Sequence, residues 1–123
     1  MAKRQRAITL KRGEVYLVNF NPSVGAEIQK TRPALILQND IANRYSPVTI
    51  VAAVSSRFHE PVYPTEVVVA PPEGGLTQRS VVLLNQVRTI DARRVVVKLG
   101  MLAPETMQRV DRALEVSLGL VEI

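Results

Sequence analysis

Three polar residues, Lys30, Thr31 and Arg32, stand directly before Pro33 and the apolar run at 34–37. An apolar run of this length is typical of a buried strand, so the three side chains are expected where a strand begins. Arginine is planar and always charged, and it can grip two phosphate oxygens at once. The cluster therefore indicates either the solvated end of a loop or a site that holds a phosphate.

The residues that common enzyme mechanisms need are largely missing from the chain. It has no cysteine and a single histidine, His59, so neither a thiolate site nor a histidine-rich metal centre is expected. The sequence shows no G-x-S-x-G motif, no phosphate-binding glycine loop and no acidic cluster with metal-ligand spacing. An enzyme of this composition would work with arginine, hydroxyl groups and a carboxylate, and we expect no metal and no cofactor.

RNA cleavage is compatible with those residues, because RNA carries its own nucleophile, the 2′-hydroxyl. A protein promotes the reaction when it aligns that hydroxyl with the phosphorus and stabilises the negative charge that the phosphate gains. Arginine suits the second task, and a neighbouring Ser or Thr hydroxyl can add a hydrogen bond.

Net charge points to the same class of partner. Sixteen Lys and Arg against eleven Asp and Glu give a formal charge of +5, which favours polyanions and nucleic acid first. Lys3, Arg4, Arg6 and Lys11 lie at the N-terminus. We predict a flexible basic arm over residues 1–10, whose role in RNA binding stays open, and a single domain over residues 11–123.

No apolar run approaches the roughly 20 residues that span a bilayer. The first ten residues are basic but have no apolar core of a secretion signal. A cytoplasmic protein without membrane contact is therefore expected.

The elements that would position these residues are mostly short strands. The patterns predict strands at 14–20, 34–38, 48–55, 65–70, 80–90 and 94–99, with a turn or short helix at 39–47 and a turn at 71–75. A helix is predicted from Pro104 to about Gly119, with Met107, Val110, Leu114 and Leu118 as its core stripe. Short strands punctuated by Pro and Gly predict a mainly β fold, a small barrel with a C-terminal α-helix.

Four stretches carry a family resemblance: RGEVYLVNFNPSVGAEIQKTRPALILQND, NRYSPVTIVAAVSS, SVVLLNQVRTID and ALEVSLGLVEI. Together they resemble the MazF/PemK family of toxin endoribonucleases, and the resemblance extends over residues 11–123. It implies an SH3-like (CcdB/PemK-type) barrel that forms a homodimer. It further implies the toxin of a type II toxin–antitoxin system, inhibited by a MazE-like antitoxin that covers the RNA groove.

The resemblance also implies the reaction, which is metal-independent and sequence-specific cleavage of single-stranded RNA. The products are a 2′,3′-cyclic phosphate (or 3′-phosphate) and a 5′-hydroxyl. The family's catalytic arginine falls on Arg32. Its threonine falls on Ser55, which keeps the hydroxyl and loses the methyl group that restricts χ1, and the adjacent Ser56 is the alternative partner. Because a guanidinium stays protonated, the general base would be a water, Glu27 or another neighbour, with His59 as a remote option.

Further side chains are candidates for RNA contact. They are Glu27, Gln29, Lys30, Thr31, Ser56, Arg57, Tyr63, Gln86 and Arg88. The loop residues among them could equally be solvated, and Gln86 with Arg88 could instead be a buried polar pair at the dimer interface. The aromatic rings of Phe58 and Tyr63 could stack on unpaired bases or cover the open end of the barrel.

Two other functions remain open on the sequence alone. A barrel of this type could poison DNA gyrase without being an enzyme, as the related CcdB family does. It could also be a plain single-stranded RNA-binding barrel. The pair Arg32 and Ser55 favours RNA cleavage, since a pure binder does not need it.

Overall fold

The computed structural model describes residues 9–20 and 31–123. Its strands form one six-stranded sheet with the order β4-β5-β3-β2-β1-β6, in which all neighbours are antiparallel. The strands are β1 (Glu14–Asn19), β2 (Thr31–Ile36), β3 (Val48–Ser55), β4 (Glu66–Val69), β5 (Ser80–Asp91) and β6 (Val95–Met101). The mainly β prediction is thus confirmed.

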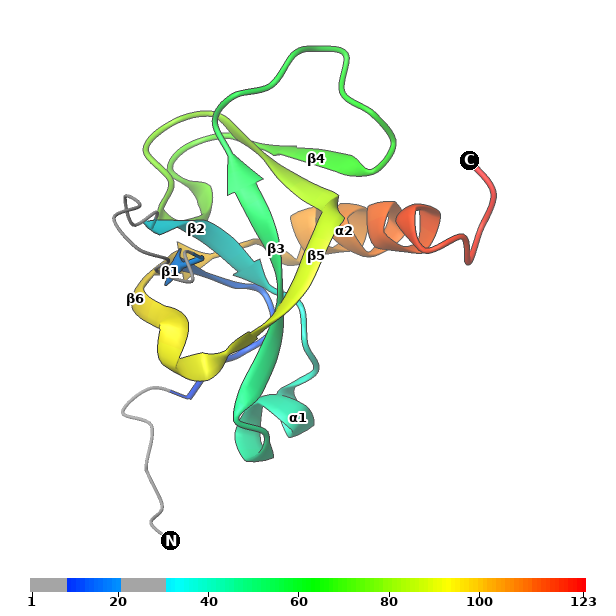
Figure 1. The fold of residues 1–123 in the computed structure, drawn as a ribbon. Helices are drawn as coiled ribbons and strands as arrows, with labels where there is room; N and C mark the ends of the chain where they lie inside the picture. The colour runs from blue at the N-terminus through cyan, green and yellow to red at the C-terminus, as the bar shows by residue number, and fades with distance from the viewer. Residues whose placement is uncertain (1–8, 21–30) are drawn as a thin grey trace, which may run out of the picture.

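Helical segments connect and cover the strands (Figure 1). The short helix α1 (Asp40–Tyr45) links β2 to β3, and the 3-10 turns η1 (Glu73–Gly75) and η2 (Ala92–Arg94) flank β5. The helix α2 (Pro104–Ser117) follows β6 and packs on β4 and β5. No helix in the described part of the chain is long and apolar enough to cross a membrane.

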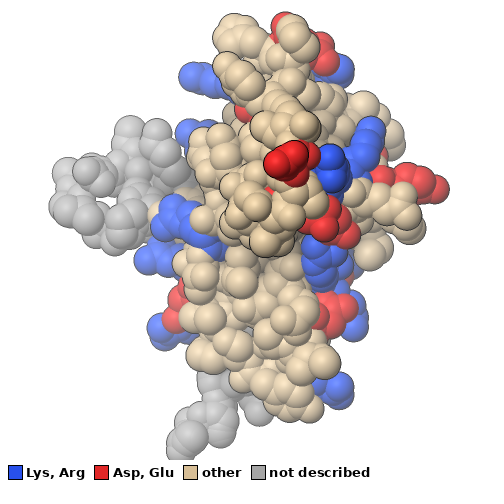
Figure 2. Space-filling view, turned by 90° about the vertical axis from the view of Figure 1, so that its right-hand side faces the viewer, with Lys and Arg blue, Asp and Glu red and all other residues tan. Residues whose placement is uncertain are grey.

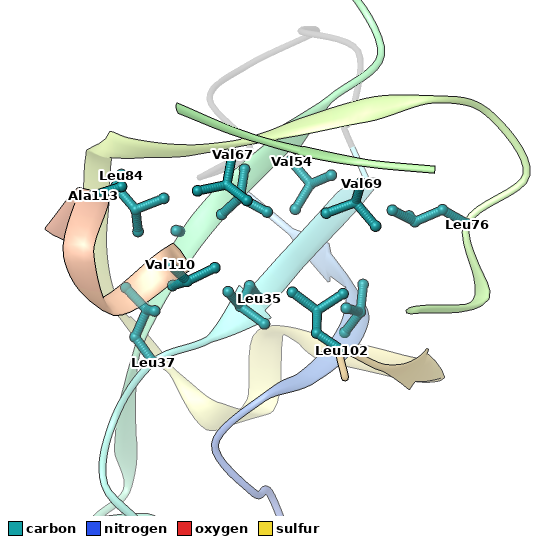
Figure 3. Close-up of a cluster of buried hydrophobic side chains, with 13 residues drawn as sticks. Leu35, Leu37, Val54, Val67, Val69, Leu76, Leu84, Leu102, Val110 and Ala113 are labelled. Atoms are coloured by element: carbon teal, nitrogen blue, oxygen red, sulfur yellow. The ribbon is translucent and has the colours of Figure 1, made fainter. Parts of the chain in front are cut away.

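Apolar side chains are buried on both faces of the sheet. Leu35, Val54 and Leu84 belong to a first core, which α2 closes with Val110 and Ala113 (Figure 3). Ala34 and Ile36, the strand neighbours of Leu35, belong to a second core with other buried residues. Because alternate residues of a strand point to opposite faces, the two cores lie on opposite sides of the sheet. The second core comprises Leu10, Tyr16, Val18, Ala34, Ile36, Val51, Ile90 and Ala92.

The N-terminal stretch enters this second core. Leu10 is only 2% exposed, although the sequence placed it in the basic arm. Residues 1–8 lie outside the described residues, so the prediction of a flexible arm stays a prediction.

Most predicted elements are present, with two differences. β2 begins at Thr31 rather than at residue 34, so Arg32 is part of the strand and not of its approach. Leu118 was predicted to be core but is 61% exposed, because α2 ends at Ser117 and Leu118 forms its C-terminal cap. Val110 is fully buried, and Met107 and Leu114 pack partly against the first core.

The turn at 71–75 packs against the backbone of another strand. Gly75 has φ +71°, and a Cβ at this position would lie 1.9 Å from the carbonyl oxygen of Leu99 in β6. Only glycine allows this approach, so η1 packs directly on the backbone of the edge strand β6.

Candidate active site on the second-core face

Arg32 and Ser55 lie on the two adjacent strands β2 and β3. The last pair of residues in the β2–β3 ladder is Ala34 with Ala53. Arg32 lies two residues before Ala34, and Ser55 lies two residues after Ala53. Since paired residues share a face and strands alternate with a period of two, Arg32 and Ser55 point to the same side of the sheet. This is the side of the second core, to which Ala34 belongs.

The two strands are not hydrogen-bonded where the candidate pair lies. Pro33 has no N–H to donate to a ladder, and the β2–β3 pairing ends at the next residue, Ala34. On its other side β2 stays paired with β1 as far as Thr31, which faces Asn19. Arg32 is therefore anchored to β1 but not to β3.

The Arg32 side chain is exposed and available. On β1 it is paired with Val18, which is completely buried in the second core. Within residues 9–20 and 31–123, Arg32 makes no ion pair with a carboxylate. A fixed backbone and a guanidinium without a carboxylate partner in those ranges suit a phosphate site.

The Ser55 hydroxyl is held by the residue two positions on. Its Oγ accepts a hydrogen bond from the backbone N–H of Arg57 at 3.1 Å and donates to the carbonyl oxygen of Arg57 at 3.3 Å. The hydroxyl thus has a defined position, and its long donor contact can be exchanged for a ligand. Ser56 is exposed and stands in a bend just after the last residue of β3.

Two further arginines gather where β1 ends. The guanidinium of Arg88 lies 5.1 Å from the ring centroid of Phe20, a cation–π distance. Arg94 donates from a terminal nitrogen to the carbonyl oxygen of Asn19 at 3.3 Å. Arg88 pairs with Val51 and so lies on the second-core face, like Arg32. Sequence reasoning missed Phe20 and Arg94, because 75 residues separate Asn19 from Arg94 and no local pattern links them.

Gln86 lies at an irregularity of β5. Leu83 pairs with Ala53 and Val87 with Ala52, so residues 84–86 are additional to the β3–β5 ladder. Bulges of this kind re-aim side chains and are frequent beside active sites. Both Asn85 and Gln86 are exposed there. The sequence predicts a single continuous strand at this point and gives no sign of the shift.

The connection between β3 and β4 carries the aromatic candidates. Tyr63 is 72% exposed, whereas Phe58 is half-buried beneath the guanidinium of Arg79, 5.6 Å from its ring centroid. His59 is exposed, as expected for a solvated loop residue. Glu27, Gln29 and Lys30 lie outside the described residues, so their predicted contacts and the Glu27 base stay predictions.

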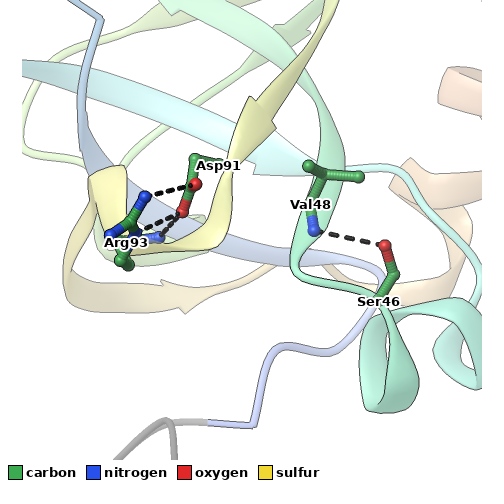
Figure 4. A network of polar contacts seen from close by, with 4 residues as sticks. All are labelled: Ser46, Val48, Asp91 and Arg93. Atoms are coloured by element: carbon green, nitrogen blue, oxygen red, sulfur yellow. Dashed lines mark hydrogen bonds and ion pairs between the residues drawn. The ribbon is translucent and has the colours of Figure 1, made fainter. Parts of the chain in front are cut away.

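Elsewhere in the described residues, four basic side chains pair with carboxylates, and Arg93 is one of them. Asp91 accepts from the backbone N–H and the guanidinium of Arg93, and these bonds lower the pKa of Asp91 to about 2 (Figure 4). In the same view Ser46 Oγ accepts from the backbone N–H of Val48, the residue that pairs with Asp91. Figure 2 shows basic and acidic side chains interspersed on the side of the molecule where the chain ends. That side is therefore no continuous basic surface.

Acidic and histidine residues in the described part of the chain do not gather into a metal site. In the described ranges no group of three or more His, Cys, Asp or Glu residues could hold a metal ion. The arrangement that the structure does present is an exposed arginine, an oriented hydroxyl and a stacked arginine on one face of the sheet.

Comparisons with known proteins find similarity to one toxin family and to an endoribonuclease. Residues 11–118 match the family described as PemK-like, MazF-like toxin of type II toxin-antitoxin system. Endoribonuclease EndoA of Bacillus subtilis is 43% identical over 113 residues, which cover 92% of this chain and 97% of that protein.

Solved structures show the same fold. A MazE–MazF crystal structure from Deinococcus radiodurans superposes with a TM-score of 0.77 at 28% identity, covering 93% of this chain and 99% of that one. An endoribonuclease in complex with its cognate antitoxin, from Mycobacterial species, gives a TM-score of 0.78 at 24% identity. The match covers 93% of this chain and 99% of that one.

Proposed function

This chain belongs to the PemK-like, MazF-like toxin family of type II toxin–antitoxin systems, and from that premise we propose how it cuts RNA. It is a toxin endoribonuclease whose substrate is single-stranded RNA, cleaved at specific short sequences without a metal ion. The observation that carries the proposal is the placement of Arg32 and Ser55 on one face of adjacent strands, beyond the point where these two strands pair with each other.

The proposed reaction is an internal displacement at phosphorus. The 2′-oxygen of the ribose forms a bond to phosphorus, the bond from phosphorus to the 5′-oxygen breaks, and a 2′,3′-cyclic phosphate is left. The 2′-hydroxyl proton passes to a general base, for which Glu27 or a water is the candidate, and the leaving 5′-oxygen takes up a proton. Arg32 stabilises the additional charge on the equatorial oxygens with its two-pronged donor set.

Ser55 rather than Ser56 is the proposed partner of Arg32. Ser55 shares the face of Arg32, and its hydroxyl is already oriented by the backbone of Arg57. Its proton can turn from the 3.3 Å contact with the Arg57 carbonyl to a phosphate oxygen while the N–H of Arg57 continues to hold the oxygen. Ser56 lies in the bend after β3, where no strand fixes the direction of its side chain, so we propose it only as an RNA contact.

RNA would be bound along the second-core face. Arg88 and Arg57 supply positive charge, Gln86 supplies an amide for a base edge, and Tyr63 supplies a ring for stacking. Thr31 is exposed at the start of β2 beside Arg32 and can reach the same phosphate backbone.

The partners follow from the same family membership. The antitoxin is MazE-like and acts by covering this face, and the active form is a homodimer in the cytoplasm. Light scattering of the purified toxin, alone and with its antitoxin, tests both assemblies; a monomer that cuts RNA at full rate contradicts the dimer.

One incubation separates cleavage from the other functions. Long single-stranded RNA is incubated with the protein in EDTA, and the ends are sequenced. Discrete cuts with 5′-hydroxyl ends support the proposal. Intact RNA with inhibited DNA supercoiling supports a gyrase poison, and gel retention without cutting supports a plain RNA binder.

The Arg32 substitution tests the mechanism directly. We expect Arg32→Ala to lower the cleavage rate by roughly a hundredfold or more, as for loss of a charge-stabilising donor. Arg32→Lys keeps the charge but loses the planar fork, so it should recover only a small part of the rate. The rate is measured at saturating RNA on an oligonucleotide that contains a mapped cut site.

A matched control removes an arginine of similar exposure elsewhere. Arg44 lies in α1, before the start of β3, and Arg44→Ala should leave the cleavage rate unchanged. Full cleavage by Arg32→Ala would refute the proposed role of the guanidinium.

A further inference from the structure

The segment that follows Ser55 is fastened by a single arginine. Arg79 donates from its two terminal nitrogens to the two carboxylate oxygens of Glu60, at 3.0 and 2.7 Å. This is the two-pronged arrangement that fixes direction as well as distance. The same guanidinium lies over the ring of Phe58. One side chain thus holds two residues of the β3–β4 connection, three and five positions after Ser55.

Arg79 is itself anchored beside Ser55. It directly precedes Ser80, the buried first residue of β5, and Val81 is the residue that pairs with Ser55 across the ladder. The β3–β4 connection is therefore fastened to the beginning of β5 at the level of the candidate active site. Figure 1 shows this connection as the long loop above the arrowhead of β3.

The fastening reaches the Ser55 hydroxyl through a short path. Ser55 Oγ takes its position from the N–H and the carbonyl oxygen of Arg57. Arg57 is the chain neighbour of Phe58, which Arg79 covers. A change in the position of Phe58 and Glu60 would therefore move the backbone of Arg57, and with it the partners of the hydroxyl.

The pair is poorly suited to other roles. Arg79 and Glu60 side chains are both about half exposed (51% each), and exposed ion pairs add little to folding stability. Glu60 also neutralises Arg79, and the hydrogen bonds from Arg79 hold the pKa of the Glu60 carboxyl below its usual value. A neutralised guanidinium is a weak ligand for an RNA phosphate, so neither global stability nor RNA affinity accounts for the arrangement.

We propose that Arg79 is a positioning residue for RNA cleavage, which holds Phe58 and Glu60 and through them orients the Ser55 hydroxyl. The inference rests on the proposed function, because it gives Ser55 a part in the reaction. It predicts that the clamp of Arg79, Phe58 and Glu60 affects the cleavage step and leaves RNA binding and folding nearly unchanged.

The test uses single-turnover cleavage of an oligonucleotide with a mapped cut site, at saturating protein and neutral pH. We expect Arg79→Ala and Glu60→Ala each to lower the rate constant roughly tenfold or more, as for a small misplacement of a reacting group. The exchanged pair, Glu60→Arg with Arg79→Glu, restores the fork between positions 60 and 79 but removes the guanidinium of Arg79 from Phe58, so it should recover part of the rate. Arg79→Lys keeps the charge without the fork and should stay slow.

The path through Ser55 is tested by a double-mutant cycle. If Arg79 acts on the hydroxyl, Arg79→Ala should have little further effect once Ser55→Ala has been made. If Arg79→Ala slows cleavage equally in the wild-type and the Ser55→Ala protein, Arg79 does not act through the Ser55 hydroxyl. A Ser55→Ala protein with full activity instead overturns the proposed function at Ser55, and that result is distinguishable because it does not depend on Arg79.

Binding and folding are measured on the same proteins. Affinity for an RNA with a 2′-deoxy residue at the cut site should be unchanged in Arg79→Ala, as should its salt dependence. A weaker affinity with a shallower salt slope and an unchanged rate constant identifies Arg79 as a phosphate contact and overturns the proposal. Arg93→Ala, which breaks the other exposed two-pronged pair with Asp91, is the control and should cleave normally. Wild-type cleavage by Arg79→Ala also overturns the proposal.

Discussion

At the scale of single residues, a buried charge is balanced by several donors on the second-core face. The Glu14 carboxylate accepts from the Lys11 backbone N–H at 2.9 Å and from the Tyr16 hydroxyl at 3.0 Å, and it pairs with Lys98 at 2.8 Å. A carboxylate can remain buried at low cost only when it is satisfied in this way. Burial and the bond to Glu14 in turn raise the pKa of the Tyr16 hydroxyl.

This raised pKa of Tyr16 predicts an alkaline loss of stability. Above about pH 10 the unfolded chain releases the tyrosine proton while the folded chain keeps it, so the free energy of unfolding falls as the pH rises. Tyr16→Phe should cost about 1 kcal/mol at pH 8 through the lost hydrogen bond, and its disadvantage should shrink towards pH 11. Thermal midpoints across this range measure both effects.

The exposed Tyr63 provides the comparison for this experiment. The thermal midpoint of Tyr63→Phe should equal that of the wild type at every pH. If the thermal midpoints of wild type and Tyr16→Phe differ by the same amount at every pH, the assigned role of the buried hydroxyl is contradicted.

Residue types alone identify the candidates in the site but not how they are held. Arg32 was predictable because it precedes an apolar run and because the family resemblance places the catalytic arginine there. The bonds between Ser55 and Arg57 and the clamp on Arg79 were not predictable, because they depend on how two separate connections meet. Long-range side-chain contacts leave no periodic signal in a sequence.

At the scale of elements, strand positions followed from the sequence and strand pairing did not. Valine-rich runs bounded by Pro and Gly located β3, β4 and β5 closely. The pairing of β1 with β6 joins the first and the last strand of the sequence and has no local signature. The early start of β2 was missed because its first residues are polar and charged and lie before the apolar run, and β1 alone pairs with them.

Two glycines with similar backbone angles make the contact of η1 with β6 testable. Gly75 (φ +71°) abuts the Leu99 carbonyl, whereas Gly119 (φ +75°) has nothing within 4 Å of an added Cβ. Gly119→Ala should therefore cost only about 1 kcal/mol, the penalty of the left-handed conformation. Gly75→Ala should cost roughly 3 kcal/mol or more, because the backbone of β6 must also move. Urea denaturation gives both values, and equal losses would show that η1 does not depend on this contact.

At the scale of the whole molecule, three of the positive charges lie close together near the N-terminus, and their contribution to RNA binding can be measured. Lys3, Arg4 and Arg6 precede the first described residue, and Leu10 belongs to the second core. The basic segment can therefore be removed without opening the core only if the deletion stops before Leu10.

Deleting residues 2–8 tests whether the arm binds RNA. We expect the slope of log affinity against log salt to become shallower by about 2, because three positive charges would no longer neutralise phosphates of a single strand. Fluorescence anisotropy with the uncleavable 2′-deoxy RNA measures the slope. An unchanged slope would assign the binding charge to the folded domain alone.

The pairing of β1 with β6 has a consequence for the synthesis of this toxin. A chain still emerging from the ribosome has β1, β2 and β3 long before it has residues 95–101, and α2 with Val110 and Ala113 is translated after β6. Until then the sheet lacks its edge strand β6, and the first core is not covered by α2. The sheet that presents Arg32 and Ser55 is therefore complete only after the segment that carries β6 and α2 has been made.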